Sequence, residues 1–409
     1  MRRAIVCVAI CTTLGCGTTS PSASRDGGSG GDAPSVIPAN PCAGIEPPAQ
    51  GPMLEYVVQQ GDRCLPGTTD GLGTLAFPVS INLVDSHGSG ILFVTPVGKL
   101  LQTYPSEEWE TNPLHQPVGF VAVTTEGGYV APKDFIGIPR WNSLGDSLRG
   151  GSRLGDHVAA AANPAGGVLV AGNLRIARTD STEHVATMFT GGGEPFDVKW
   201  GPKPLASGGA VFGAGVDSLG RSLVITDGTQ KYGNGYVSGQ WFEQDGTPLT
   251  GEFVLLKDFS AGTATQLETS PLIGGGLLVR RMDLDRTFHA LVLVVVPSGS
   301  TTASAAPEWM ISRRDVKLEI TRGGRAYVAL PYGAHQVTCS QRVEVFAQDG
   351  TSCGSRDFPI AVGTCDTRDV TQGADGTIIQ QLPLSMETRS NPSDGAHTCT
   401  WRWWAGALR

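Results

Sequence analysis

Phe242-Glu-Gln-Asp-Gly-Thr247 returns 104 residues further along the chain as Phe346-Ala-Gln-Asp-Gly-Thr351. The Asp-Gly pair in both copies is typical of a tight β-hairpin, because both central residues of such a turn accept a positive φ. The interval corresponds to two units of about 52 residues, a period that indicates a repeat architecture. The stretch therefore predicts a hairpin that recurs at a fixed place in a repeated unit.

The same unit can be followed through three glycines. Each is followed 22 residues later by a phenylalanine and 26 residues later by a second glycine. The first glycines are Gly167, Gly220 and Gly324, the phenylalanines are Phe189, Phe242 and Phe346, and the second glycines are Gly193, Gly246 and Gly350. We interpret the unit as two successive hairpins, one at the first glycine and one at the second.

Short apolar runs rich in β-branched residues lie between these turns, for example at 119–124, 167–171, 222–226 and 290–296. Such runs predict strands, and the sequence has no long amphipathic pattern that would predict a helix. The 56 glycines agree with many short strands joined by tight turns. The fold class is therefore predicted to be all-β.

Four strands in every unit of about 40 to 55 residues resemble the blades of a β-propeller. The resemblance covers residues 50–409 and is one of period and pattern, without a WD or kelch signature. Counting 75–104 as a blade predicts seven four-stranded blades, whereas six are predicted if this region completes the C-terminal blade. The alternative is two successive β-sandwich domains joined near residues 205–210.

The N-terminus has the pattern of an export signal. Arg2 and Arg3 precede an apolar run, 4–14, that is too short to span a bilayer as a helix. Thr13-Leu14-Gly15-Cys16 resembles the lipobox of bacterial lipoproteins, although its leucine stands two residues before the cysteine where the family prefers three. The resemblance implies that Cys16 is acylated and becomes the first residue of the mature chain. A plain signal peptide is the alternative.

The segment after Cys16 is rich in Gly, Ser, Thr and Pro, and it predicts a flexible tether. The domain organisation is thus a signal peptide with its anchor cysteine at 1–16, a tether at 17–41 and one β domain at 42–409. Glycine at position 17 resembles the pattern for outer-membrane sorting. We expect an exported lipoprotein of the outer membrane or cell surface, facing the periplasm or the exterior, that contacts the membrane through its N-terminal lipid.

Nine cysteines occur in the chain, of which Cys7 and Cys11 lie in the signal. An even number after Cys16 in an exported chain predicts disulfides. The simplest pairing joins neighbours in sequence, while other connectivities stay open, and a metal or redox site is disfavoured because there is no CxxC pair. The predicted pairs are Cys42–Cys64, Cys339–Cys353 and Cys365–Cys399.

The net charge and the catalytic motifs that the sequence lacks argue against several classes of function. The net charge is −8 and the body contains no run of Lys or Arg, which argues against a nucleic-acid partner. The sequence lacks the motifs of a nucleophile elbow, a zinc protease, a phosphate loop and a calcium loop. Asp283, Asp285 and His289 would share a strand face, but hairpins commonly carry such acids. We therefore predict no catalytic residues, no metal and no cofactor.

Trp401, Trp403 and Trp404 stand near the C-terminus. In a strand the first two share a face and the third takes the other. We expect a closing strand packed between sheets, and the alternative is an aromatic surface that stacks on sugars or a peptide. The expected function is a binding or scaffold module of the cell envelope with a protein or carbohydrate partner, not an enzyme. The alternative is a hydrolase or lyase of extracellular polysaccharide, with two carboxylates converging in a central channel.

Overall fold

The computed structural model separates residues 1–40 from a second compact unit, 41–409, that contains all strands among the described residues. The structure describes residues 40–64, 66–83, 86–105, 121–123, 127–130, 140–144, 146–148, 159–176, 181–190, 198–257, 265–283, 290–331, 340–359, 370–382 and 397–408. The predicted signal, Cys16 and nearly all of the predicted tether lie outside these residues. None of the helices in the described part is long and apolar enough to cross a bilayer.

The strands form seven four-stranded antiparallel blades. Blade 1 contains β2 (Thr68–Thr69), β3 (Leu75–Leu83), β4 (Ser86–Val94) and β5 (Leu100–Pro105). Blade 2 contains β6 (Val121–Ala122), β7 (Tyr129–Val130), β8 (Arg140–Trp141) and β9 (Ser147–Leu148). Blade 3 contains β10 (Ala159–Ala162), β11 (Val168–Ile176), β12 (Ser181–Phe189) and β13 (Val198–Pro204). Blade 4 contains β14 (Val211–Val216), β15 (Ser222–Asp227), β16 (Val237–Phe242) and β17 (Phe253–Leu256).

The remaining blades follow the same order. Blade 5 contains β18 (Thr265–Pro271), β19 (Leu277–Asp283), β20 (Ala290–Val296) and β21 (Ser304–Ala305). Blade 6 contains β22 (Val316–Ile320), β23 (Tyr327–Pro331), β24 (Ser340–Phe346) and β25 (Ser352–Pro359). Blade 7 contains β26 (Val370–Gln372), β27 (Ile378–Gln381) and β28 (His397–Trp404), completed by the N-terminal strand β1 (Met53–Cys64). Two short helices, α1 (Thr229–Tyr232) and α2 (Glu308–Ile311), lie in connections.

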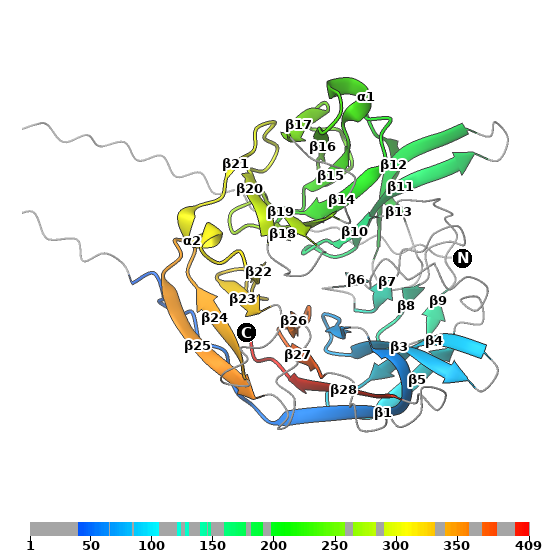
Figure 1. Ribbon diagram of the computed structural model, residues 1–409, viewed down its shortest axis with the longest axis vertical. Helices are drawn as coiled ribbons and strands as arrows, with labels where there is room; N and C mark the ends of the chain where they lie inside the picture. The colour runs from blue at the N-terminus through cyan, green and yellow to red at the C-terminus, as the bar shows by residue number, and fades with distance from the viewer. Residues whose placement is uncertain are drawn as a thin grey trace, which may run out of the picture. The chain divides into compact units, whose positions relative to one another are not determined.

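The first strands of the blades follow one another in a closed circuit (Figure 1). Contacts run from β6 to β10, β14, β18 and β22, then through blade 6 to β26 and on to β2. A backbone bond from Gly71 N to Val123 O (2.7 Å) joins blade 1 to blade 2 and completes the circuit. The fold is therefore a seven-bladed β-propeller. The six-blade and two-sandwich alternatives are wrong, because 75–105 forms its own blade and β1 completes the last one.

The quoted hairpin joins strand 3 to strand 4 in blades 4 and 6. Gly246 N donates to Glu243 O (2.9 Å), and Gly350 N donates to Ala347 O (3.0 Å). The first glycine of the repeat lies in the turn between strands 1 and 2, where Gly220 has a φ of +80° that side-chain-bearing residues rarely adopt. The prediction of two hairpins per unit is confirmed for the units of Gly220 and Gly324, whereas Gly193, the second glycine of the first unit, lies outside the described residues. Because neighbouring strands run in opposite directions, the strand 1–2 and strand 3–4 turns of a blade lie at one end of the ring, which we call the turn end. Blade 7 has no strand 3–4 turn, and the end of β28 and the start of β1 lie there instead.

The closing strand β28 places its tryptophans in two different cores. Trp401 and Trp403 face blade 1, where the ring of Trp401 stacks on that of Phe77 with centroids 4.7 Å apart. Trp404 faces blade 6 and meets Phe358 edge-on. The expected alternation and the closing strand are confirmed. The predicted aromatic surface is wrong for Trp401, Trp403 and Trp404, because all three side chains are at most 1% exposed.

The disulfide pairing differs from the predicted one. Cys42 is bonded to Cys353, which lies 311 residues later. The pairs Cys42–Cys64 and Cys339–Cys353 are therefore wrong. The physical reason is ring closure, which carries the segment ahead of β1 past blade 6, so that distance along the sequence is a poor guide to proximity.

Cys399 is also disulfide-bonded. Its predicted partner, Cys365, lies outside the described residues, and the pair Cys365–Cys399 stays a prediction. The segment between Cys42 and β1 is held to the C-terminus as well, because Ala49 N donates to Ala407 O (2.8 Å).

Candidate functional site

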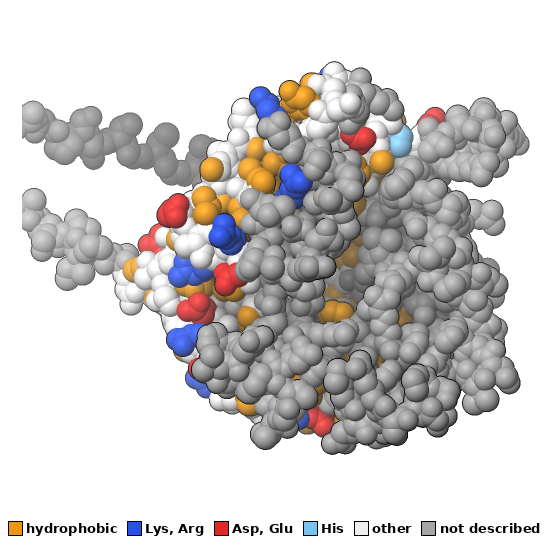
Figure 2. Space-filling model, viewed as in Figure 1, with side chains coloured by type: hydrophobic (Ala, Val, Ile, Leu, Met, Phe, Trp, Pro, Cys, Tyr) orange, Lys and Arg blue, Asp and Glu red, His pale blue; other side chains and the backbone are white. Residues whose placement is uncertain are grey.

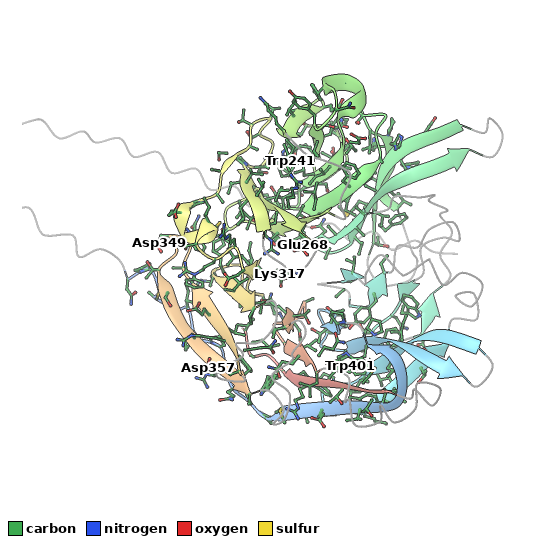
Figure 3. All side chains as sticks on the ribbon, viewed as in Figure 1. Trp241, Glu268, Lys317, Asp349, Asp357 and Trp401 are labelled. Atoms are coloured by element: carbon green, nitrogen blue, oxygen red, sulfur yellow. A yellow bond between two sulfur atoms is a disulfide. The ribbon has the colours of Figure 1, made fainter. Side chains whose placement is uncertain are left out.

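Charged side chains mark the first strands of two neighbouring blades. Within the first strands that the structure describes, the charged residues are Glu268 on β18 and Lys317 and Glu319 on β22. Arg280 joins them from β19. The first strand of blade 3 is by contrast Ala159–Ala162. We call Glu268, Arg280, Lys317 and Glu319 the charged quartet, and Figure 3 labels two of its members between β18 and β22.

Arg280 connects blade 5 to blade 6. Its side chain is 1% exposed, and Nη2 lies 2.6 Å from Glu268 Oε2. Nη1 donates to the carbonyl oxygen of Val316 at 2.8 Å, at the start of β22. A buried guanidinium is tolerated only when it is paired and hydrogen-bonded, so these contacts account for its position in the interface.

Lys317 and Glu319 form the second ion pair of the quartet. They stand two residues apart on β22, so both side chains lie on one face of the strand. Glu319 is the main cause that raises the pKa of Lys317, with Glu268 adding to it, while burial and Arg280 act in the opposite direction. The ammonium group therefore stays protonated at neutral pH.

The quartet is a charge-balanced polar group. Each carboxylate is paired with a cation, Glu268 with Arg280 and Glu319 with Lys317. The side chains of Glu268, Lys317 and Glu319 are 25%, 34% and 21% exposed, so a solute can reach them. This arrangement suits binding of a polar ligand that exchanges for one of the ion pairs.

A shallow hollow of about 590 Å³ lies at the turn end between blades 6 and 7. It is lined by Arg322, Gly323, Asp375, Ala405 and Gly406. The carboxylate of Asp375 accepts bonds from the backbone N–H and the hydroxyl of Thr377 and from the hydroxyl of Thr69. The carboxylate thus stabilises its own turn and the contact with blade 1. The main group that the hollow presents to a ligand is therefore the guanidinium of Arg322.

Several residues considered in the sequence fall outside the described part. These are Cys16, Asp285 and His289. Among the described residues no group of three His, Cys, Asp or Glu side chains could hold a metal ion. The sequence reasoning missed the charged quartet. The sequence feature that could have indicated the quartet is the presence of charged residues within otherwise apolar strand patterns, as in Val316-Lys-Leu-Glu-Ile320.

No protein-family model matches the chain, and no curated relative matches it. Prolyl oligopeptidase B from Galerina marginata shares 8% identity over 83% of this chain and 50% of its own, with a TM-score of 0.45. The C-terminal WD40 domain of Sif2 shares 11% identity over 85% of this chain and 98% of its own, with a TM-score of 0.39. A gluconolactonase from Xanthomonas campestris shares 12% identity over 86% and 100%, with a TM-score of 0.34.

The chain thus spans half the length of the prolyl oligopeptidase that it resembles. Similarity at this level carries no argument about what the chain binds or converts. The function must be argued from the residues of the chain itself.

Proposed function

We propose that the chain is a lipid-anchored protein of the outer membrane or cell surface whose propeller is a binding or scaffold module for a protein or carbohydrate partner. The observation that supports a binding role is the pairing of Glu268 with Arg280 and of Glu319 with Lys317. The pattern Thr13-Leu14-Gly15-Cys16 and the polar segment behind it support the anchor.

The construction of the ring agrees with a scaffold. The first and last strands pair with each other from Met53 with Trp404 to Val58 with Cys399. The same strand β1 pairs with β3, so blades 7 and 1 form one continuous sheet. A ring closed in this way presents its connections on a rigid frame, which is how propellers recognise partners.

The anchor is tested by intact-mass analysis and fractionation of cells that express the wild type or Cys16→Ala. We expect an acylated mass and membrane association for the wild type, and an unacylated protein released from the membrane for the variant. An unmodified wild-type protein in the soluble fraction would remove the anchor from the proposal.

The second candidate is a hydrolase or lyase of extracellular polysaccharide, favoured by the presence of two carboxylates, Glu268 and Glu319, on first strands. The test is the release of reducing ends or unsaturated products from neutral and acidic polysaccharides. A binding module retains a polysaccharide without turnover. Turnover that Glu319→Gln or Glu268→Gln abolishes, while the fold is kept, would replace the binding role by the enzymatic one.

A further inference from the structure

Exposed apolar side chains gather at the turn end of the ring. The large apolar residues that are well exposed in the described part are Met53, Val57, Leu72, Val97, Leu100, Leu144, Val198 and Leu219. All except Val57 lie in a strand 1–2 or 3–4 turn or at the first position of the strand at that end. The described connections at the opposite end, 205–210, 228–236 and 306–315, contribute none.

Three of these residues lie together over blades 1 and 2. Leu72, Val97 and Leu144 are 63%, 77% and 61% exposed, and we call them the apolar turn patch. Both Leu72 and Ser143, the neighbour of Leu144, border the space beside the Cα of Gly127. The turns that hold Leu72 and Val97 touch through their neighbours, because a Cβ at Gly73 would lie 3.3 Å from Cγ of Pro96.

The turn geometry does not demand apolar residues at these places. The position of Leu72 is taken in blades 3, 5, 6 and 7 by Ala165, Gly274, Gly323 and Asp375, in turns with the same backbone bond to the opening residue. The position of Val97 and Leu144 is taken in blades 4 and 6 by Asp245 and Asp349. Blade 4 carries an exposed leucine, Leu219, at the position of Leu72, and the other blades compared carry small or charged residues there. Blades 1 and 2 are therefore distinguished by three exposed apolar side chains in neighbouring turns, and an exposed patch of this kind marks an interaction surface.

The chain enters the fold at the same end. Cys42 is bonded to Cys353, which directly follows the strand 3–4 turn of blade 6. Gly44 lies against Arg325 in the strand 1–2 turn region of the same blade. The 24 residues between Cys16 and Pro41 span a root-mean-square distance of about 27 Å as a flexible chain. An anchor at Cys16 thus keeps the turn end within reach of the bilayer.

We propose that the turn end docks on the bilayer that holds the lipid, with Leu72, Val97 and Leu144 inserted at the interface. This inference rests on the proposed lipid anchor. Each tip alone would bind weakly, but the tether raises the effective concentration of the surface, so a weak contact suffices to orient the ring.

The charges near the patch indicate an apolar contact. The basic residues Lys99, Lys199, Arg322 and Arg325 are exposed at the turn end, and so are the acidic residues Asp146, Asp245 and Asp349. An anionic membrane is attracted by the first group and repelled by the second. We therefore expect the contact to be insensitive to salt, unlike one made by a basic patch.

The test uses the acylated protein in vesicles of phosphatidylethanolamine and phosphatidylglycerol. An environment-sensitive fluorophore is placed on Val97→Cys and, as a control at the opposite end, on Asp315→Cys. Flotation of the vesicles establishes the anchor, and brominated lipids report the depth of each label. We expect blue-shifted emission and quenching for the label at 97 only, at both low and high salt.

Leu72→Ala with Leu144→Asp removes the rest of the patch while keeping residues that the same turn positions carry in other blades. This pair is expected to lower the quenching at position 97 at least about threefold. Val57→Thr, which removes apolar area outside the apolar turn patch, is the matched control. It is expected to leave the quenching at position 97 unchanged.

A protein that floats while its label at 97 stays in water overturns the docking and leaves the anchor intact. A protein that does not float overturns the anchor and the docking together. A label at 97 that shifts only when a soluble envelope protein is added, without lipid, assigns the patch to a protein partner and also overturns the proposal.

Discussion

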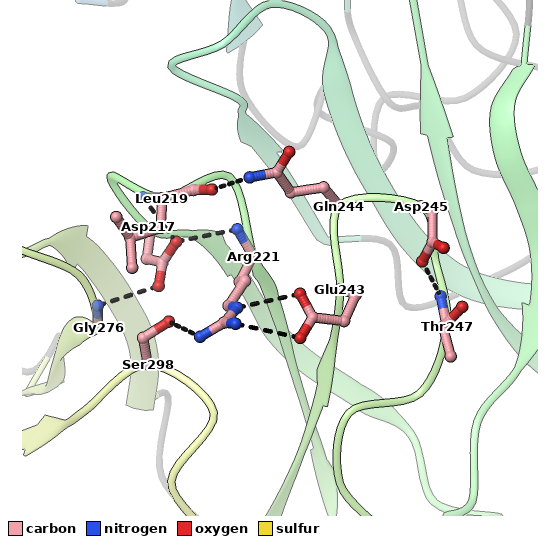
Figure 4. A network of polar contacts seen from close by, with 9 residues as sticks. All are labelled: Asp217, Leu219, Arg221, Glu243, Gln244, Asp245, Thr247, Gly276 and Ser298. Carbon is pink, nitrogen blue, oxygen red and sulfur yellow. Dashed lines mark hydrogen bonds and ion pairs between the residues drawn. The ribbon is translucent and has the colours of Figure 1, made fainter. Parts of the chain in front are cut away.

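The carboxylate of Asp217 joins two blades, and Asp217→Asn tests what this junction contributes. Oδ1 accepts the backbone N–H groups of Leu219 and Arg221 at 2.9 Å, both within the turn of blade 4. Oδ2 accepts the N–H of Gly276 in blade 5 at 3.0 Å (Figure 4). The residue is completely buried. Asparagine keeps one acceptor oxygen but places an NH₂ group where Oδ2 stood.

The cost follows from these contacts. A hydrogen bond to a charged group contributes about 1.5–3 kcal/mol, and a buried donor left without an acceptor costs about 1–3 kcal/mol. In the variant the Gly276 N–H faces a second donor, and rotation of the amide would only move the conflict to Leu219 and Arg221. Because the two contributions overlap, we expect a loss of about 2–4 kcal/mol in the free energy of unfolding.

Urea unfolding followed by tryptophan fluorescence measures the change. With an m-value of about 3 kcal/mol/M, a loss of about 3 kcal/mol lowers the midpoint by about 1 M. Asp245→Asn is the matched control, because its exposed carboxylate accepts bonds from Thr247 within its own turn and does not join two blades (Figure 4). The control is expected to unfold close to the wild type. Equal midpoints for the two variants would refute the inter-blade role of Asp217.

Three further results are expected. Replacing Cys42 and Cys353 by serine removes a link across 311 residues, which in the chain-entropy limit costs about 5–6 kcal/mol, measured by denaturant unfolding under oxidising conditions. Burial raises the pKa of Asp70 above its ordinary value, although its hydrogen bonds oppose this. The folded state therefore holds the Asp70 proton more tightly than the unfolded state. The stability that this proton contributes is lost as pH rises from about 4 through the raised pKa. Asp70→Asn should remove this pH dependence from the unfolding midpoint. The raised pKa of Lys317 contributes stability that is complete below the ordinary lysine value and is lost as pH rises through the raised one. Glu319→Gln should weaken that high-pH loss, and an unchanged alkaline profile would contradict the pairing.

The blade repeat could be predicted because it depends on residues whose conformation is required by their own turn or strand. Gly220 and Gly246 hold positive φ angles in successive turns of one blade. Phe242 ends the third strand and pairs with Ser222, at the start of the second. Such requirements recur at fixed offsets in the units of Gly167, Gly220 and Gly324 and do not depend on the rest of the fold. The same locality made the two-faced packing of the C-terminal tryptophans predictable.

Features that arise from ring closure could not be predicted in this way. The disulfide joins residues 42 and 353 because β1 completes blade 7, and no local pattern reports that a strand at the start of the domain pairs with one at its end. The charged quartet is equally non-local, because Arg280 finds Val316 only when blades 5 and 6 pack together. Basic and acidic side chains are interspersed on the surface of blade 6 (Figure 2), and for β24 this follows from strand alternation, because Arg342 and Glu344 alternate with the buried Val343 and Val345.

The place of the Cys42–Cys353 disulfide gives the closed ring a mechanical property. Without the disulfide, tension on the chain ahead of Met53 would break the bond from Ala49 N to Ala407 O and then the pairs of β1 with β28, beginning at Trp404. The disulfide intercepts that tension at Cys42 and passes it to β25. β25 is joined to its neighbours through the chain at both ends, so a pull on Cys353 can distort the strand but cannot release an end of the chain. A protein held by the proposed tether therefore keeps its ring closed under load while the disulfide is intact, and after reduction β1 becomes the first element to yield.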